Sequence, residues 1–444
     1  MKKLTFLLVS MLAFNQLSAQ TTEDVQLNTI TTAVPFVMIS GDPQQMASGD
    51  VGVVSSNLYN ATAFTSNAAL LATGHKYLNV NTNFTPWLRA LVPDINMVSF
   101  SAASAFHKRH AVGFYFKDFS LGNITFTDNQ GQSIGSFNPN EFLVQINYAT
   151  WFPSGISLGI GAKYIYSNLT GGINIGGADT RPGQAFASDL GVNYRKHFQK
   201  TDLIGLGYSL GLGLNNIGTK IGYTQTNEKD FLPMNMMVGA MFNLGIKYGK
   251  VRFEHDLGYQ VTKLLVPTPP EYGRNQYFND NLPPGDSIGQ RNNPSNLDPT
   301  FNQIIAGKDP NVPVFQGLIQ SFGDAPRGTQ EEWNEVIHQV AHEFRFVLND
   351  FFMVAVREGL FYEHETKGNR QFFSYGLGVG VAGFRLDFGG WIPFQSRSPL
   401  ENTVFVGLSY RMKLGKNKKL MRFPVWSLEQ EYANEVEAIL DEAD

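Results

Sequence analysis

One pair of histidines in the sequence has the spacing of metal ligands. His338 and His342 are four residues apart, the spacing that puts two metal ligands on one face of a helix, and Glu343 follows them. The second histidine, however, opens into an alternating apolar run at 344–348, which predicts a strand. Residues four apart on a strand are separated by about 13 Å, at roughly 3.3 Å per residue. We therefore expect the two histidines not to share a metal ion.

Charged residues alternate along two other segments, with Arg252, Glu254 and Asp256 in one and Arg385 and Asp387 in the other. Paired carboxylates can act as general acid and base. Opposite charges also line the wet interior of membrane barrels, which is the more ordinary use of such positions. The sequence contains no H-E-x-x-H. We predict no catalytic residue, no metal site and no cofactor.

A glycine pattern at 378–383 matches G-x-G-x-x-G by letter. Dinucleotide binding requires this pattern to open a helix after a strand. Here the residues on both sides alternate as strands do. The glycines are therefore expected to face a barrel interior.

The elements that must position these residues alternate apolar and polar side chains. Between Ile204 and Asn215, Ile, Leu and Tyr interleave with Gly, Ser and Asn. Successive side chains of a strand point to opposite faces, so such a segment has one apolar and one polar face. Fourteen segments of this kind can be counted: 76–85, 97–106, 110–119, 142–148, 158–164, 190–194, 204–214, 236–246, 251–261, 344–348, 351–361, 375–381, 384–388 and 404–410.

Composition and connections favour one architecture. Charged residues make up 16% of the 444 residues, against about 25% in soluble domains, while aromatic residues make up 13% and 44 residues are glycine. The mean hydropathy of −0.16 and the pI near 6.1 argue against a helical membrane protein and a nucleic-acid binder. Short and long connections alternate. We predict an all-β membrane protein, a 14-stranded antiparallel transmembrane β-barrel; the alternative is a soluble β-sandwich.

The chain divides into four predicted parts. Lys2 and Lys3, an apolar run and a small-residue site ending at Ala19 predict a cleaved signal peptide at 1–19, the alternative being an uncleaved anchor. Residues 20–75 are expected to form a plug inside the barrel, or else a disordered periplasmic leader. The barrel is expected at 76–413, with a long extracellular loop at about 265–335. The tail at 414–444 is predicted to carry a short acidic helix in the periplasm.

Several stretches resemble the PorV (LptO) family of the type IX secretion system, which is related to the FadL-type fourteen-stranded barrels. They include FTPWLRALVPDIN at 84–96, NNIGTKIGY at 215–223, KLLVPTPP at 263–270 and AGKDPNV at 306–312. The likeness runs from about residue 35 to 412. The sequence departs from the family at 67–69, where it has Asn-Ala-Ala in place of Asn-Pro-Ala, and in its tail.

The resemblance implies an outer-membrane protein without enzymatic activity that binds the C-terminal signal domains of secreted proteins. It would shuttle them from the large outer-membrane translocon to the sortase, or attachment, complex at the cell surface. Its expected partners are these proteins and outer-membrane lipid, with no nucleic acid. A FadL-type transporter of hydrophobic small molecules is the alternative function, and a barrel enzyme acting on lipid A is a third class.

Apolar and aromatic residues in the outward loops are candidates for the cargo site. We expect it to include Trp87, Leu88, Arg89, Phe315 and Phe322. Large apolar groups facing solvent on a surface loop indicate a protein partner. Packing of one loop on another is the alternative explanation.

Overall fold

The computed structural model describes residues 27–413 apart from 56–59, 73–76, 108, 128–129, 173, 176–177, 202, 225–228, 274–302 and 350. The predicted signal peptide at 1–19 and the predicted tail helix within 414–444 lie outside the described residues. Within those residues no helix has the length and the apolar character needed to span a bilayer.

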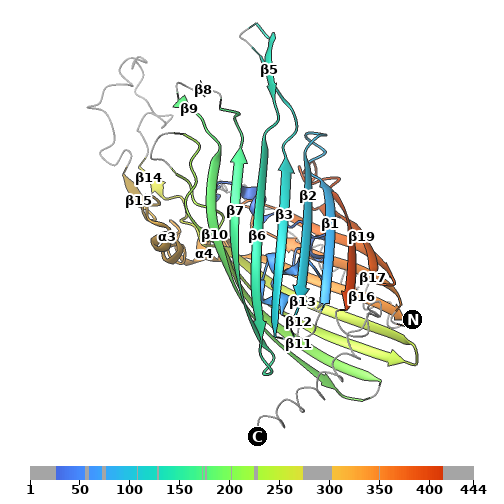
Figure 1. Ribbon diagram of the computed structural model, residues 1–444. Helices are drawn as coiled ribbons and strands as arrows, with labels where there is room; N and C mark the ends of the chain where they lie inside the picture. The colour runs from blue at the N-terminus through green and yellow to red at the C-terminus, as the bar shows by residue number, and fades with distance from the viewer. Residues whose placement is uncertain are drawn as a thin grey trace, which may run out of the picture.

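Fourteen of the described strands close into one antiparallel barrel (Figure 1). The last strand pairs with the first, from Tyr77 opposite Lys413 to Phe84 opposite Val406. The fourteen-stranded barrel predicted from the alternating segments is therefore confirmed. The strands are β1 (Tyr77–Pro86), β2 (Asn96–Ala105), β3 (His110–Ser120), β6 (Asn140–Trp151), β7 (Ile156–Asn168), β10 (Gly183–Gln199), β11 (Ile204–Gly218), β12 (Asn235–Tyr248), β13 (Val251–Leu264), β16 (Ile337–Leu348), β17 (Phe352–Tyr362), β18 (Gln371–Val381), β19 (Phe384–Pro393) and β20 (Val404–Lys413).

The wall of the barrel carries apolar side chains outside, whereas its inner face mixes polar and small side chains with buried apolar ones. On β11, Leu210 and Leu212 are exposed, whereas Ser209 and Asn215 are buried. This alternation is the reverse of a soluble protein, because the outer surface faces lipid and the inner surface faces a polar interior. The predicted division of faces is therefore present in the folded chain.

Short and long connections lie at opposite ends of the barrel. The connections at 152–155, 249–250 and 382–383 are tight turns. The connections at 121–139, 169–182 and 265–336 are long and carry structure of their own. They contain the pairs β4 (Ile124–Thr127) with β5 (Ser133–Phe137), β8 (Asn174–Ile175) with β9 (Ala178–Asp179) and β14 (Glu271–Tyr272) with β15 (Ile304–Ala306), and the helices α3 (Val314–Gln320) and α4 (Thr329–Asn334). Long loops mark the extracellular end of an outer-membrane barrel.

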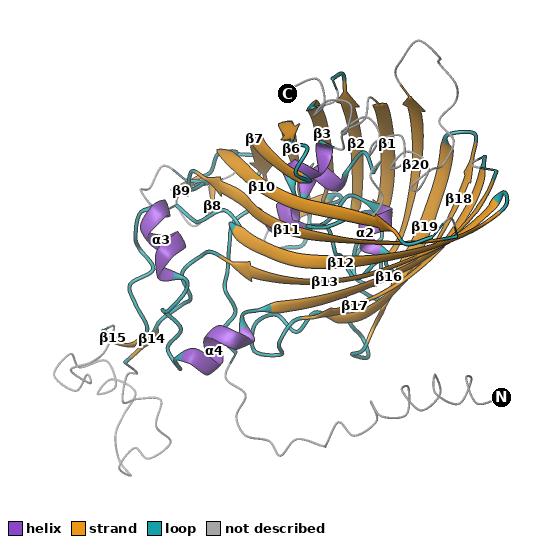
Figure 2. Ribbon diagram, turned by 90° about the horizontal axis from the view of Figure 1, so that it is seen from below, coloured by secondary structure: helices purple, strands orange, loops and turns teal. Residues whose placement is uncertain are grey.

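Residues 27–55 and 60–72, which we call the inner segment, run from beside α4 into the barrel (Figure 2). The inner segment contains four short helices: η2 (Pro35–Met38), α2 (Pro43–Met46), η3 (Ala63–Thr65) and η4 (Ala68–Leu71). These are too short to satisfy their own backbone groups, so side chains of the wall do so. The pairs are Lys117 (β3) with Ile39, Gln260 (β13) with Gly52 and Val53, Ser374 (β18) with Ala47 and Gly49, and Trp391 (β19) with Met46.

Inward-facing glycines of the wall make room for the backbone of the inner segment. A Cβ atom on Gly359 would lie 2.0 Å from the backbone nitrogen of Gly49, and one on Gly159 would lie 2.3 Å from the carbonyl carbon of Ala68. Neither backbone atom can move away as a flexible side chain could. These glycines therefore permit the close approach of two main chains.

Replacing Gly359 by valine is expected to displace the inner segment around Gly49. Overpacking a rigid site costs about 1–3 kcal/mol or more, so the temperature at which the barrel unfolds should fall, and protease should cut the inner segment faster. Heat-modifiable migration on gels and limited proteolysis with mass spectrometry measure the two effects. Gly323→Val is the control, because nothing lies within 4 Å of its Cβ position. Equal behaviour of the two variants would contradict this packing.

Candidate functional site

The end of the barrel that carries the long connections is the candidate functional site. Residues 265–336 pass there through β14, β15, α3 and α4 (Figure 1). The connection between β1 and β2, at 87–95, belongs to the same end of the barrel. All five residues expected in the cargo site lie in these two connections. The residues of the two connections differ in how far they are exposed.

Trp87 is buried, contrary to the expectation that its ring faces solvent. Its side chain is 8% exposed, and its ring packs edge-on against Trp391, with 5.5 Å between ring centroids. Trp391 in turn stacks on Phe372 at 4.3 Å. The ring of Trp87 therefore stabilises the join between this loop and the barrel wall and is not free to contact a partner. Leu88 is half-buried against the same cluster, while Arg89 is exposed.

Phe315 and Phe322 are exposed as expected, and the structure adds Ile319 between them. Their side chains are 74%, 51% and 58% exposed, respectively. Because residues at i, i+4 and i+7 share one face of a helix, these three form an apolar stripe along α3 and the residues that follow it. We call Phe315, Ile319 and Phe322 the α3 stripe. The helical spacing was a signal in the sequence that could have identified Ile319.

The opposite face of α3 anchors the helix. Val314 and Leu318 pack on a buried cluster made by the base of the long loop and the connection after β11. Gly317 faces the ring of Phe231, where a Cβ atom would lie 2.8 Å away. The members of the buried cluster are Phe231, Met234, Leu265, Val266 and Val312. The α3 stripe therefore lies on a helix whose other face is packed against the barrel end.

Helix α4 is fixed by buried ion pairs. Lys263, at the end of β13, bonds Glu335 at 2.5 Å and Glu332 at 3.0 Å. Lys367, in the connection after β17, bonds Glu331 at 2.7 Å and Glu335 at 3.0 Å. These charge-assisted bonds join α4 to two barrel strands. Trp333 of α4 projects into solvent, and the sequence reasoning did not identify it.

Asp324 lies buried beside these carboxylates. Its Oδ2 accepts a hydrogen bond from the backbone N–H of Thr268 at 3.2 Å, while its Oδ1 is buried without a hydrogen-bond partner among the described residues. Burial raises the pKa of Asp324 most, the nearby charges of Glu332 and Glu335 add to the rise, and together they bring it to about 6 despite the hydrogen bonds with Thr268. The ionised form of Asp324 is therefore disfavoured in the folded loop.

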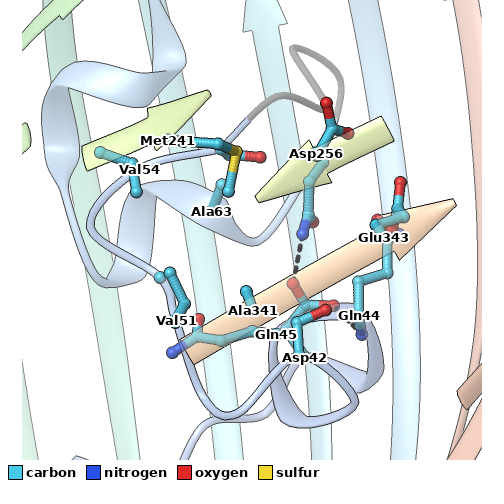
Figure 3. A pocket seen from close by; sticks show the side chains of 14 residues that line it. Asp42, Gln44, Gln45, Val51, Val54, Ala63, Met241, Asp256, Ala341 and Glu343 are labelled. Atoms are coloured by element: carbon cyan, nitrogen blue, oxygen red, sulfur yellow. Dashed lines mark hydrogen bonds between the residues drawn. The ribbon is translucent and has the colours of Figure 1, made fainter. Parts of the chain in front are cut away.

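The alternating charges of β13 and β19 face the interior, where they meet charges from β16 and β17. Arg345 bonds Asp256 at 2.7 Å and Glu254 at 2.9 Å. Arg357 bonds Asp387 at 2.8 Å and also pairs with Glu343. A cavity of about 50 Å³, lined partly by Asp256 and Glu343, separates this cluster from the inner segment (Figure 3). Carboxylates paired in this way neutralise the interior of the wall and are not arranged as a free acid and base.

The histidine pair belongs to the outer face of a strand. His338 and His342 both lie on β16, where His338 bonds the hydroxyl of Tyr259 at 2.7 Å and His342 bonds Glu358 at 2.9 Å. Among the described residues no group of three or more His, Cys, Asp or Glu side chains could hold a metal ion. Gly378 lies on β18 and faces Asp387 and Arg357 of the interior, as expected for a glycine of the wall.

A comparison with protein families identifies the family of this chain. The family model described as type IX secretion system protein PorV matches residues 21–271, more than half of the chain. The chain belongs to the PorV family. It is accordingly an outer-membrane β-barrel of the type IX secretion system. No protein with a curated description matches the chain.

Solved structures with a similar barrel include transporters of other families. The toluene transporter TbuX of Ralstonia pickettii is 11% identical with a TM-score of 0.38, over 84% of this chain and 98% of its own. The toluene transporter TodX of Pseudomonas putida is 8% identical with a TM-score of 0.39, over 84% of this chain and 99% of its own. A FadL homologue of Pseudomonas aeruginosa is 8% identical with a TM-score of 0.33, over 87% of this chain and 97% of its own.

Asp324→Asn is expected to stabilise the long loop near neutral pH. Because the pKa of Asp324 is raised, the folded loop keeps a proton between about pH 4 and pH 6 that the unfolded loop has lost. The free energy of unfolding of the loop therefore falls as pH rises through this range. Asparagine removes the charge and keeps an acceptor for Thr268. Hydrogen exchange of residues 265–336 at pH 8 should be slower in the variant, with little difference at pH 4. A gain of equal size at both pH values would contradict the buried charge.

Proposed function

We propose that this protein receives the C-terminal signal domains of secreted proteins at its extracellular end and shuttles them from the translocon to the attachment complex. Membership of the PorV family supports a role in the secretion system. The handling of signal domains is the function that the family resemblance implies. Its site on this chain is proposed to be the long loop.

The observation that carries this proposal is the α3 stripe. Three large apolar side chains, each more than half exposed, lie in line on an element whose other face is packed against the barrel end. Aromatic and aliphatic anchors of this kind dominate the free energy of protein–protein binding. A supported helix also loses little conformational freedom when a partner binds. Arg89 and Leu88, at the rim of the same end, complete the proposed site without Trp87.

The interior supports a protein-binding role over passage of hydrophobic solutes. We propose that the inner segment acts as a plug. Its contacts with the wall combine hydrogen bonds with packed apolar side chains. The cavities that border it are about 50 and 60 Å³ and are lined by both polar and apolar side chains. An apolar solute in such a space would strip water from buried polar groups and give them no hydrogen bonds in return.

Replacing Phe315, Ile319 and Phe322 together by serine is expected to weaken signal-domain binding by about tenfold or more, since each buried anchor contributes about 1 kcal/mol or more to an interface. The barrel should remain folded, because the three side chains face solvent. Co-purification of a signal-domain cargo from detergent-solubilised outer membranes measures the loss. Phe106→Ser is the control, since Phe106 is 54% exposed in a short turn at the opposite end. Undiminished capture by the triple variant would refute the site.

Deleting the gene for this protein distinguishes secretion from solute uptake. We expect signal-domain proteins to disappear from the cell surface, because their extracellular acceptor is missing. Uptake of a labelled long-chain fatty acid should be unchanged, because the inner segment fills the interior and the cavities beside it are only about 50 and 60 Å³. Surface proteomics and uptake assays on one pair of strains give both answers. Lost uptake with normal secretion would favour the FadL-type transporter instead.

A further inference from the structure

Three ionisable or polar side chains meet on the outer face of the barrel. They are His255 on β13, His342 on β16 and Glu358 on β17, and we call them the outer polar cluster. The Nδ1 atom of His342 lies 2.9 Å from Oε1 of Glu358, and its Nε2 atom lies 3.5 Å from Nδ1 of His255. The two imidazole rings are stacked at 5.8 Å. Three strands that are adjacent in the barrel thus contribute to one cluster.

The residues that flank the cluster along β16 and β17 are apolar, as the lipid-facing wall requires, and Tyr375 of β18 lies opposite Glu358. Val356 and Leu360 precede and follow Glu358 on the outer face of β17, and Phe344 and Val340 flank His342 on β16. Glu358 is the seventh of the eleven residues of β17. A strand crosses the hydrocarbon layer in about 9–11 residues, so this position is near the middle of the membrane.

A carboxylate at this depth costs free energy if lipid covers it. Hydrocarbon supplies no hydrogen bonds, and ionisable residues within membrane-spanning segments normally face a polar interior or a partner. Glu358 faces outward, and 56% of its side chain stays exposed although His342 bonds one of its oxygens. The outer polar cluster therefore retains capacity to accept a hydrogen bond from outside the chain.

We propose that the outer face of β13, β16 and β17 binds a second integral outer-membrane protein, which presents an arginine or lysine side chain to Glu358. Charge complementarity favours a different protein over a second copy of this chain. In a two-fold dimer through this face, each copy would bring the same carboxylate toward the axis, and like charges repel strongly in a medium of low dielectric constant. The inference depends on the barrel lying in a membrane and does not depend on cargo binding by the α3 stripe.

The test places a photo-crosslinking amino acid at Leu360 in the full-length protein in its native outer membrane. We expect an adduct with an integral outer-membrane protein other than this chain. Its yield should fall at least about tenfold with Glu358→Leu, the loss of one charge-assisted contact, and persist with Glu358→Asp. The same probe at Ile160, on the apolar outer face of β7, is the control and should give lipid adducts only.

Barrel stability separates binding from a structural role of the cluster. Glu358→Leu should unfold at the same or a higher temperature than the parent, because it removes a charge from the lipid-facing wall. If the leucine variant fails to assemble, Glu358→Gln tests the same charge with the same shape. Four outcomes would overturn the proposal. Three concern the adduct: a yield that does not change with the residue at 358, a second copy of this chain as the partner, or lipid adducts only. The fourth is a marked drop in the unfolding temperature of the variant.

Discussion

The structure depends on one constraint: inside a bilayer, every backbone N–H and C=O group must find its partner within the protein. For a chain of strands this requires the last strand to bond the first, as β20 bonds β1 from Tyr77 to Phe84. Closure in turn fixes the two faces of every strand, apolar toward lipid and polar toward the interior. The low content of charged residues and the alternating segments both follow from this constraint.

A closed wall with a polar inner face needs something polar to fill it. The inner segment does so with short helices whose backbone groups bond wall side chains such as Gln260 and Ser374. Gly159 and Gly359 let the two main chains approach, which gives the glycines of the wall a packing role. Charges that remain inside are paired across neighbouring strands, as between Arg345 and Asp256. The interior is therefore a packed core in which paired polar groups and buried apolar clusters lie side by side.

The ends of the barrel are free of the lipid constraint, and there the chain forms its long connections and the exposed α3 stripe. An apolar cluster under α3 and the lysines bonded to α4 hold the described part of the long loop. Asn28 of the inner segment also bonds Glu331 of α4 at 2.8 Å, so the interior and the extracellular loop share one network. Supported in this way, the α3 stripe presents apolar side chains to water. The outer polar cluster, by contrast, presents polar side chains on the lipid-facing wall.

The sequence alone determined the strands, because alternation with period two and the contrast between short and long connections are local properties of the chain. It also determined that Arg252, Glu254 and Asp256 face inward. Only the tertiary structure decided that Trp87 is buried, since its partner Trp391 comes from a strand 304 positions later in the chain. The outer polar cluster likewise joins β13, β16 and β17 across the wall. Contacts between distant strands are set by register and closure, which no local pattern encodes.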